Sequence, residues 1–145
     1  MGFSISRRTS LSAVEAWTRL TDWSAHSGLI PFTVVTLDPD QPPVGVGSRF
    51  VGRTTMGPLS FDDPMEVTFW EPPTQNRAGM CRIVKRGTVV VGWAVLTVTP
   101  DPSGAGCTVT WQEQADVRRA GPLLRGPNAL VGKAVFSRLL TQLLT

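Results

Sequence analysis

Apolar residues recur with a helical period near both ends of the chain and with a strand period between them. The chain opens with alternating apolar and polar residues, which predict a short strand. Val14, Trp17 and Leu20 then follow at helical spacing, behind a capping box that runs from Ser12 to Glu15. A second short helix is expected at Trp23–His26, so the chain is predicted to begin as strand, helix, helix.

From Phe32 to Val117 the alternation has a period of two, and turn residues interrupt it at short intervals. This stretch predicts six strands, which form an antiparallel meander with the first strand. The end of the chain places apolar side chains on one face, which predicts an amphipathic helix that covers residues 122–145 if it begins at Pro122. Pro127 then stands either in its first turn or at a kink. We expect this helix to bury its apolar face on the sheet.

The composition sets the scale of the protein and removes several classes of enzyme. The 145 residues, of which 41% are hydrophobic, predict a single domain over residues 1–145 that folds without disulfides or metals. The single histidine, His26, excludes metal sites that need two or three imidazoles, and tyrosine is absent as an acid or nucleophile. Val44–Gly47 is not a dinucleotide fingerprint either. We therefore expect no metal and no cofactor.

The sequence also bears on where the protein works. Its apolar runs are too short for a membrane span, and its start lacks the apolar core of a signal peptide. We expect a cytoplasmic protein in which Cys81 and Cys107 are reduced, because a predicted strand at 88–99 separates the strands that carry them. The arginine-rich, lysine-poor composition is typical of a GC-rich bacterial genome, and nothing in the sequence indicates an oligomeric state.

The net charge of +3 comes from basic residues that are scattered along the chain. The largest group is Arg82, Lys85 and Arg86, which stand before Gly87 and are expected at a solvated hairpin tip. A nucleic-acid site would need stacking aromatic residues beside the positive charges. No nucleic-acid partner is therefore expected.

The turns of the predicted hairpins decide which side chains face the interior of the sheet. A two-residue turn at 57–58 pairs Gly52 with Asp63 on the inner face, although a one-residue slip would turn Asp63 outward. In the last strand the apolar parity places Glu113 inside, beside Trp111. The other inner side chains predicted for the first hairpin are mostly apolar: Phe50, Thr54, Met56, Phe61, Met65, Val67 and Phe69.

A second hairpin is predicted with a two-residue turn at 86–87, which pairs Val84 with Val89. Arg82 and Trp93 then lie within stacking reach on the outer face. Small side chains on the inner face either let a helix approach closely or leave a void: Gly79, Cys81, Gly92 and Ala94.

Two carboxylates on an otherwise apolar inner surface are the most informative feature of the sequence. A buried carboxylate is costly unless it finds a partner, meets water or takes up a proton. Asp63 precedes Pro64 and can bond backbone donors at a bulge, while Glu113 can sit at a wet cavity mouth or pair with an arginine. The alternative is that both orient a ligand or act as general acid and base.

The order of the elements and several short motifs resemble one superfamily. The motifs are Ala16-Trp17-Thr-Arg-Leu-Thr-Asp22-Trp23, Val46-Gly47-Ser-Arg-Phe50, Gly57-Pro58, Trp70-Glu-Pro-Pro73, Gly87-Thr-Val-Val-Val-Gly92 and Trp111-Gln-Glu113. Over almost its whole length the chain resembles the START-like superfamily called SRPBCC, in its polyketide cyclase/dehydrase-related bacterial branch. The resemblance implies an α+β helix-grip fold. In this fold a seven-stranded curved antiparallel sheet wraps around a long C-terminal helix, two short helices lie between strands 1 and 2, and a cavity lies between sheet and helix.

Three functions are compatible with this resemblance, because the superfamily includes lipid carriers, hormone receptors, aromatic cyclases and chaperone-binding modules. The first is binding of a small hydrophobic ligand, such as a lipid or polyketide, in the cavity between the sheet and the C-terminal helix. The second is a cyclase/dehydratase-like enzyme that uses cavity carboxylates as acid and base, so the sequence leaves open whether the protein is an enzyme. The third is a protein-interaction module with an outer apolar patch around Trp70 and Trp93.

The resemblance also defines the candidate site. The catalytic candidates are Asp63 and Glu113. His26 is expected either to pair with Asp22 on a helix surface or to rim the pocket entrance, because the short helices border the pocket in this fold. With His26, the expected ligand contacts are Phe50, Met65, Phe69, Cys81, Trp111 and Leu124.

Overall fold

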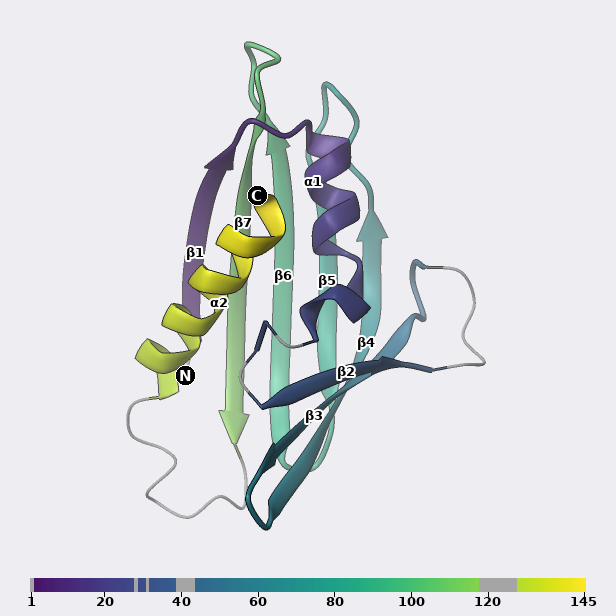
Figure 1. Ribbon diagram of the computed structural model, residues 1–145. Coiled ribbons are helices and arrows are strands. Elements are labelled where there is room, and N and C mark those ends of the chain that lie inside the picture. Colours follow the sequence, from purple (N-terminus) through teal and green to yellow (C-terminus); the bar gives the residue numbers. More distant parts are fainter. Residues whose placement is uncertain (1, 28, 31, 39–43, 118–127) are drawn as a thin grey trace.

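The computed structural model describes residues 2–27, 29–30, 32–38, 44–117 and 128–145. Its elements follow one another in the order that the sequence predicts: a strand, two short helices, six strands and a helix (Figure 1). They are β1 (Gly2–Thr9), α1 (Ala13–Leu20), the 3-10 helix η1 (Trp23–His26), β2 (Thr33–Leu37), β3 (Arg49–Met56), β4 (Leu59–Glu71), β5 (Gly79–Arg86), β6 (Val90–Pro100), β7 (Cys107–Val117) and α2 (Asn128–Leu144).

The seven strands form one antiparallel sheet in the order β1-β7-β6-β5-β4-β3-β2. From β2 to β7 each strand pairs with the next in the chain, which is the predicted meander, and β1 adds to it beside β7. The sheet curls into a half-barrel, and α1 and α2 lie against the same face of it (Figure 1). The predicted α+β helix-grip fold is confirmed.

Both helices turn an apolar face toward the sheet. The Ser12 hydroxyl accepts a hydrogen bond from the Glu15 backbone N–H at 3.1 Å, so the predicted cap starts α1. The helix α2 packs chiefly against β1 and buries three leucines of its last two turns, Leu139, Leu140 and Leu143. The predicted start of this helix at Pro122, and Pro127, lie outside the described residues. No helix in the described part of the chain is long and apolar enough to cross a membrane.

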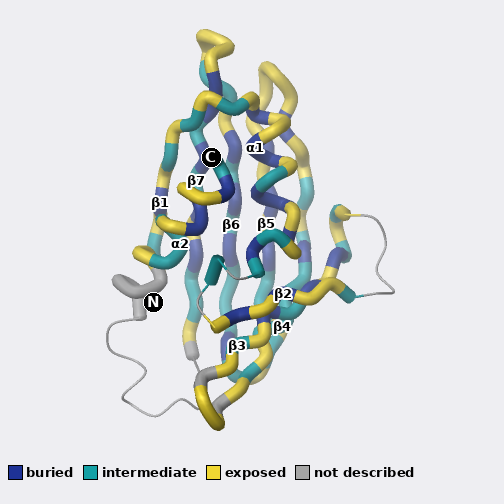
Figure 2. Tube along the Cα trace, viewed as in Figure 1, coloured by how far each residue is buried: buried dark blue, intermediate teal, exposed yellow. Residues whose placement is uncertain are grey.

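The main core lies under α1 and the last turns of α2, toward one end of the sheet (Figure 2). Ala16, Trp17 and Leu20 are buried there, and Trp17 meets Trp70 of β4 edge-on at 5.0 Å. Cys81 and Cys107 are buried free thiols on strands that β6 separates, as predicted. Closely packed hydrocarbon at this end anchors the helices over the sheet.

The first hairpin has the predicted register. Gly52 pairs with Asp63 and Arg53 with Asp62, so Asp63 lies on the inner face while Asp62 and Arg53 form an ion pair outside at 3.6 Å. Gly57, at the turn, has a φ of 58°, which glycine adopts without strain. The turn therefore fixes which of the two neighbouring aspartates is internal.

The second hairpin corrects the predicted register. Val84 pairs with Trp93 instead of Val89, because the connection is longer than the expected two residues. The shift is an even number of positions, so each side chain stays on its predicted face. Arg82 accordingly still lies over the Trp93 ring on the outer face, 5.4 Å from its centroid.

A β-bulge in β4 makes one predicted cavity residue wrong. The pairing with β5 shifts between Val67 and Phe69, so Phe69 lies opposite Arg82 on the outer face and is 43% exposed. Trp70, which strict alternation would place outside, turns inward onto Trp17.

Gly92 of β6 occupies a position that only glycine can fill. Its φ is 143°, and a Cβ atom there would lie 1.8 Å from the Gln114 carbonyl oxygen of β7. Because Gly92 lacks a side chain, the backbones of β6 and β7 can approach each other here. Gly92 pairs with Lys85 of β5 on one side and with Ala115 of β7 on the other. Gly92 thus allows β6 and β7 to pair closely at this point.

We expect Gly92→Ala to lower the free energy of unfolding by about 3 kcal/mol or more, because strain and a backbone clash add. The matched control is Gly104→Ala, which has a φ of 79° but nothing within 4 Å of the added Cβ, and should cost about 1 kcal/mol. Urea denaturation measures both. Equal losses in the two variants would show that the close approach to β7 does not matter.

Candidate ligand-binding cavity

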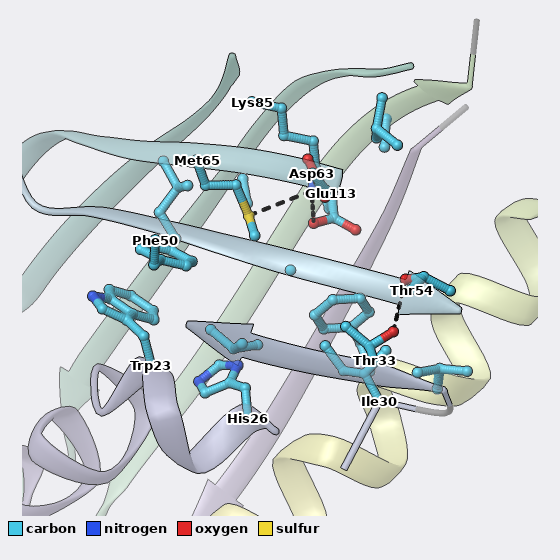
Figure 3. A pocket seen from close by; sticks show the side chains of 18 of the residues that line it. Trp23, His26, Ile30, Thr33, Phe50, Thr54, Asp63, Met65, Lys85 and Glu113 are labelled. Atoms are coloured by element: carbon cyan, nitrogen blue, oxygen red, sulfur yellow. Dashed lines mark hydrogen bonds and ion pairs between the residues drawn. The ribbon is translucent and has the colours of Figure 1, made fainter. Parts of the chain in front are cut away.

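A cavity of about 340 Å³ lies between the sheet, η1 and α2. Its wall is mostly hydrocarbon and takes residues from every strand of the sheet, from η1 and from α2 (Figure 3). The lining residues are Phe3, Trp23, His26, Ile30, Thr33, Val35, Phe50, Gly52, Thr54, Phe61, Asp63, Met65, Ile83, Lys85, Val90, Ala94, Trp111, Glu113, Ala115, Val135 and Phe136.

Two stacked aromatic pairs contribute to the wall. Trp23 of η1 stacks on Phe50 of β3, with ring centroids 4.7 Å apart and planes inclined by 10°. Trp111 of β7 stacks on Phe136 of α2 at 5.2 Å, and Phe3 of β1 also meets Phe136. Because each pair joins different elements, the stacked rings hold these elements together around the apolar wall.

Three charged side chains meet on the sheet side of the cavity. The Lys85 ammonium on β5 donates a hydrogen bond to Asp63 Oδ2 on β4 at 2.6 Å and lies 3.8 Å from Glu113 Oε1 on β7. The side chains of Lys85 and Glu113 are only 7% and 8% exposed. Lys85 also approaches the Met65 sulfur at 3.6 Å. We call Asp63, Lys85 and Glu113 the charged cluster; Figure 3 shows them pointing toward one another.

Small residues make room for the charged cluster. Strand β6 lies between β5 and β7, and its inner positions at this level are Gly92 and Ala94, which pair with Lys85 and Glu113 respectively. Gly52 of β3, opposite Asp63, adds no side chain either. The Lys85 side chain can therefore extend across β6 toward Glu113 of β7. Of the two outcomes predicted for the small inner residues, the void is found at Ala94, whereas Cys81 lies in the packed core under α1.

Burial and mutual attraction set the protonation of the charged cluster. Burial raises the pKa of both carboxyl groups, against the opposing effect of the Lys85 ammonium. Burial by itself would lower the pKa of Lys85, but Glu113 and Asp63 together hold it above its ordinary value. The lysine therefore stays charged, while the carboxyl groups hold protons to a higher pH than exposed acids do.

Asp63 is incompletely satisfied. Its Oδ1 atom is buried and has no hydrogen-bond partner among the described residues, and the same holds for the indole N–H of Trp23 and Trp111. A buried acceptor without a donor is costly. A ligand that donates a hydrogen bond to Oδ1 would remove this cost.

His26 lies in the cavity wall rather than on a helix surface. Its Nε2 atom is 2.9 Å from the Leu20 carbonyl oxygen, and since a carbonyl only accepts, Nε2 carries the hydrogen. Burial lowers the pKa of His26, against the hydrogen bond to Leu20 and the charge of Asp22. The imidazole is therefore neutral, with Nδ1 as an acceptor, and the predicted surface pair with Asp22 is wrong.

The structure brings together most of the residues that the sequence singles out. Asp63, Glu113, Phe50, Met65, Trp111 and His26 all line the cavity. Cys81 does not: it is fully buried in the core under α1, where burial raises its pKa to about 12. Phe69 is outside because of the bulge, and Leu124 lies outside the described residues.

Lys85 is the charged site residue that the sequence analysis missed. The sequence predicts a solvated hairpin tip for Arg82, Lys85 and Arg86, yet the Lys85 side chain is only 7% exposed, whereas Arg82 and Arg86 are exposed. The signal was present, since Lys85 shares the inner parity of Ile83 and stands two residues after it. Glu113 thus pairs with a lysine instead of an arginine.

The charged cluster does not hold the ligands that a metal needs. In the described residues no three histidine, cysteine, aspartate or glutamate side chains gather closely enough to bind a metal ion. Its third member, Lys85, is a cation that would repel one.

The comparisons with known proteins agree with this geometry. A family described as "Polyketide cyclase / dehydrase and lipid transport" matches residues 2–145, and the chain belongs to this family. No protein of curated function matches the chain in sequence.

Several solved structures share the fold. A STAR-related lipid transfer protein from Xanthomonas axonopodis has a TM-score of 0.70 and 17% identity, over 98% of this chain and 85% of that one. Human STARD10 has a TM-score of 0.72 and 10% identity, over 99% of this chain and 63% of its own. Norcoclaurine synthase from Thalictrum flavum, in complex with dopamine and hydroxybenzaldehyde, has a TM-score of 0.61 and 15% identity, over 99% and 85%.

The raised pKa of Glu113 predicts how stability depends on pH. Its contribution to stability is complete below the ordinary pKa of a glutamate and is lost as the pH rises toward the raised value in the folded protein. We therefore expect the wild type to lose stability relative to Glu113→Gln as the pH rises above the ordinary pKa of a glutamate, 4.5. Urea denaturation at a series of pH values measures this difference.

The control is Glu66→Gln, which removes a carboxylate that pairs with Arg86 on the outer face. This variant should not reproduce the change in relative stability with pH that is expected of Glu113→Gln. A constant difference between wild type and Glu113→Gln over the whole range would contradict the prediction.

Proposed function

We propose that the protein binds a small hydrophobic molecule in the cavity, with one polar group of the ligand against the charged cluster. The observation that carries the proposal is an apolar space of about 340 Å³ that ends on three charges of which two are almost fully buried. Protein interiors normally close such spaces, because unfilled volume forfeits contacts. The size and the few convergent polar groups are those of small-molecule sites.

The comparisons support binding of this kind. The family description includes lipid transport, and one neighbour in structure is a lipid transfer protein. The stacked aromatic pairs supply apolar contact, and the charged cluster supplies orientation. A protein-interaction module would need no internal space, so the cavity favours a small ligand over that alternative.

N-phenyl-1-naphthylamine, a neutral dye that fluoresces in apolar surroundings, tests the proposal. We expect saturable binding of about one dye per protein chain, with quenching of tryptophan fluorescence because Trp23 and Trp111 line the cavity. Ala94→Phe fills the space from the inner face of β6 and should weaken binding at least tenfold, about 1.4 kcal/mol.

The matched control is Val95→Phe, one residue along on the opposite face, where Val95 pairs with Arg82. This variant should bind the dye as the wild type does. Absence of saturable binding by the wild type, or equal binding by the two variants, would refute the cavity as the site.

A second candidate function is favoured by Lys85. An enzyme of the cyclase or dehydratase type needs a proton donor and a proton acceptor next to an enolisable carbon. The sequence offers no tyrosine for this, but a buried ammonium between two carboxyl groups with raised pKa supplies both roles. In this reading a carboxylate takes the proton from carbon, and the Lys85 ammonium stabilises the enolate oxygen.

Exchange of carbon-bound hydrogen tests this second function. We expect the protein to accelerate deuterium exchange at the carbons beside the carbonyl of 4-phenyl-2-butanone in heavy water, followed by NMR. Asp63→Asn and Glu113→Gln should lower the accelerated rate about a hundredfold. Asp62→Asn, which alters the outward-facing neighbour of Asp63, should leave the rate unchanged. If the wild type does not accelerate deuterium exchange, the second function is refuted and ligand binding remains the proposed function.

A further inference from the structure

The charges that line the cavity do not balance. Among the described lining residues, the titratable groups are Asp63 on β4, Lys85 on β5, Glu113 on β7 and His26 on η1. With both acids ionised and His26 neutral, two negative charges face one positive charge. One uncompensated negative charge then remains next to apolar walls, where an unpaired charge is expensive.

The geometry of the charged cluster shows where the imbalance lies. The Lys85 ammonium makes a short contact with Asp63, at 2.6 Å, and stays 3.8 Å from Glu113. One lysine thus satisfies one oxygen of Asp63 closely, while Glu113 is held by a longer ion pair and Asp63 Oδ1 has no partner among the described residues. The charged cluster can therefore accept hydrogen bonds from one more positively charged group.

We propose that the cavity selects molecules that carry a protonated amine on an aromatic or aliphatic frame. The inference rests on the proposed function and names the polar group that this site prefers. In the empty protein a proton on one of the carboxyl groups balances the charge. When the ligand enters, its ammonium group replaces that proton, which leaves to solvent, and donates hydrogen bonds to the carboxylates.

The walls suit the rest of such a ligand. The aromatic faces of Trp111 and Trp23 border the same space as the charged cluster, and an ammonium group near an aromatic face gains a further attraction. The hydrocarbon part of the ligand would rest between the two stacked pairs, Trp23 with Phe50 and Trp111 with Phe136.

The same charges disfavour anionic ligands. A fatty acid or another carboxylate would bring a further negative charge toward Asp63 and Glu113, while the ammonium of Lys85 is already shared between them. A neutral alcohol can donate one hydrogen bond but cannot compensate the charge. We therefore expect the order of affinity to be amine, alcohol, carboxylate.

Three probes with one frame test this order: 3-phenylpropylamine, 3-phenylpropan-1-ol and 3-phenylpropanoate. Each displaces N-phenyl-1-naphthylamine from the full-length protein at about pH 7.5, where the amine is protonated. We expect the amine to bind at least tenfold more tightly than the alcohol, and the carboxylate to bind most weakly. An amine no tighter than the alcohol overturns the inference.

Variants locate the preference in the charged cluster. Glu113→Gln and Asp63→Asn each remove the surplus negative charge and should reduce the amine-to-alcohol affinity ratio at least fivefold, because the charged amine loses more affinity than the neutral alcohol. Asp62→Asn is the matched control, because Asp62 lies next to Asp63 but pairs with Arg53 on the outer face, and it should keep the wild-type ratio. An unchanged ratio in both cavity variants overturns the inference.

The wild type provides a second test that needs no variant. Because the ammonium displaces a proton, amine affinity should rise with pH as long as the amine stays protonated, and calorimetry in phosphate and Tris buffers should show proton release. The alcohol should show neither effect. Failure of the amine order with intact dye binding leaves the proposed function standing. Failure of the dye and all three probes to bind overturns the proposed function as well.

Discussion

A lysine ammonium buried among hydrocarbon must have carboxylates within a few ångströms, and this requirement ties three strands of the sheet together. Asp63 on β4, Lys85 on β5 and Glu113 on β7 meet only because their hairpins hold them in register on the inner face. Strand β6 lies between two of them and can contribute only small residues there, Gly92 and Ala94. The cavity and its single polar end follow from the same arrangement.

The packed core and the cavity lie at different positions along the sheet. Under α1 and the last turns of α2, buried aliphatic residues and the Trp17–Trp70 contact form a filled core. At the cavity, by contrast, aromatic rings from η1, β3, β7 and α2 border open space. A void and a buried charged cluster both reduce stability, and the filled core offsets that cost. Rigid strands, rather than loops, hold all three charges in place, which favours a defined geometry for a ligand.

The sequence predicts the fold well because its signals are local and repeated. The order of elements, the meander and the register around Asp63 follow from alternation and from the glycine turn at Gly57. The site is predicted less completely. The sequence places Lys85 at a hairpin tip because it stands beside Arg86 and Gly87, although it shares the parity of the inner residue Ile83. It places Phe69 inside because no residue type marks the bulge in β4, and the spacing there is decided by tertiary pairing.

The bulge in β4 also affects how relatives of this chain can be compared. Up to Val67 the odd-numbered residues of the strand face inward, and beyond it the even-numbered Trp70 does. A homologue that lacks the extra residue keeps one phase throughout, so a column-by-column alignment would equate an interior side chain with an exterior one. Transferring the assignment of inner and outer residues between such proteins therefore requires an alignment gap at Thr68. A sequence profile without that gap would mix residues from the two faces of the strand in one column.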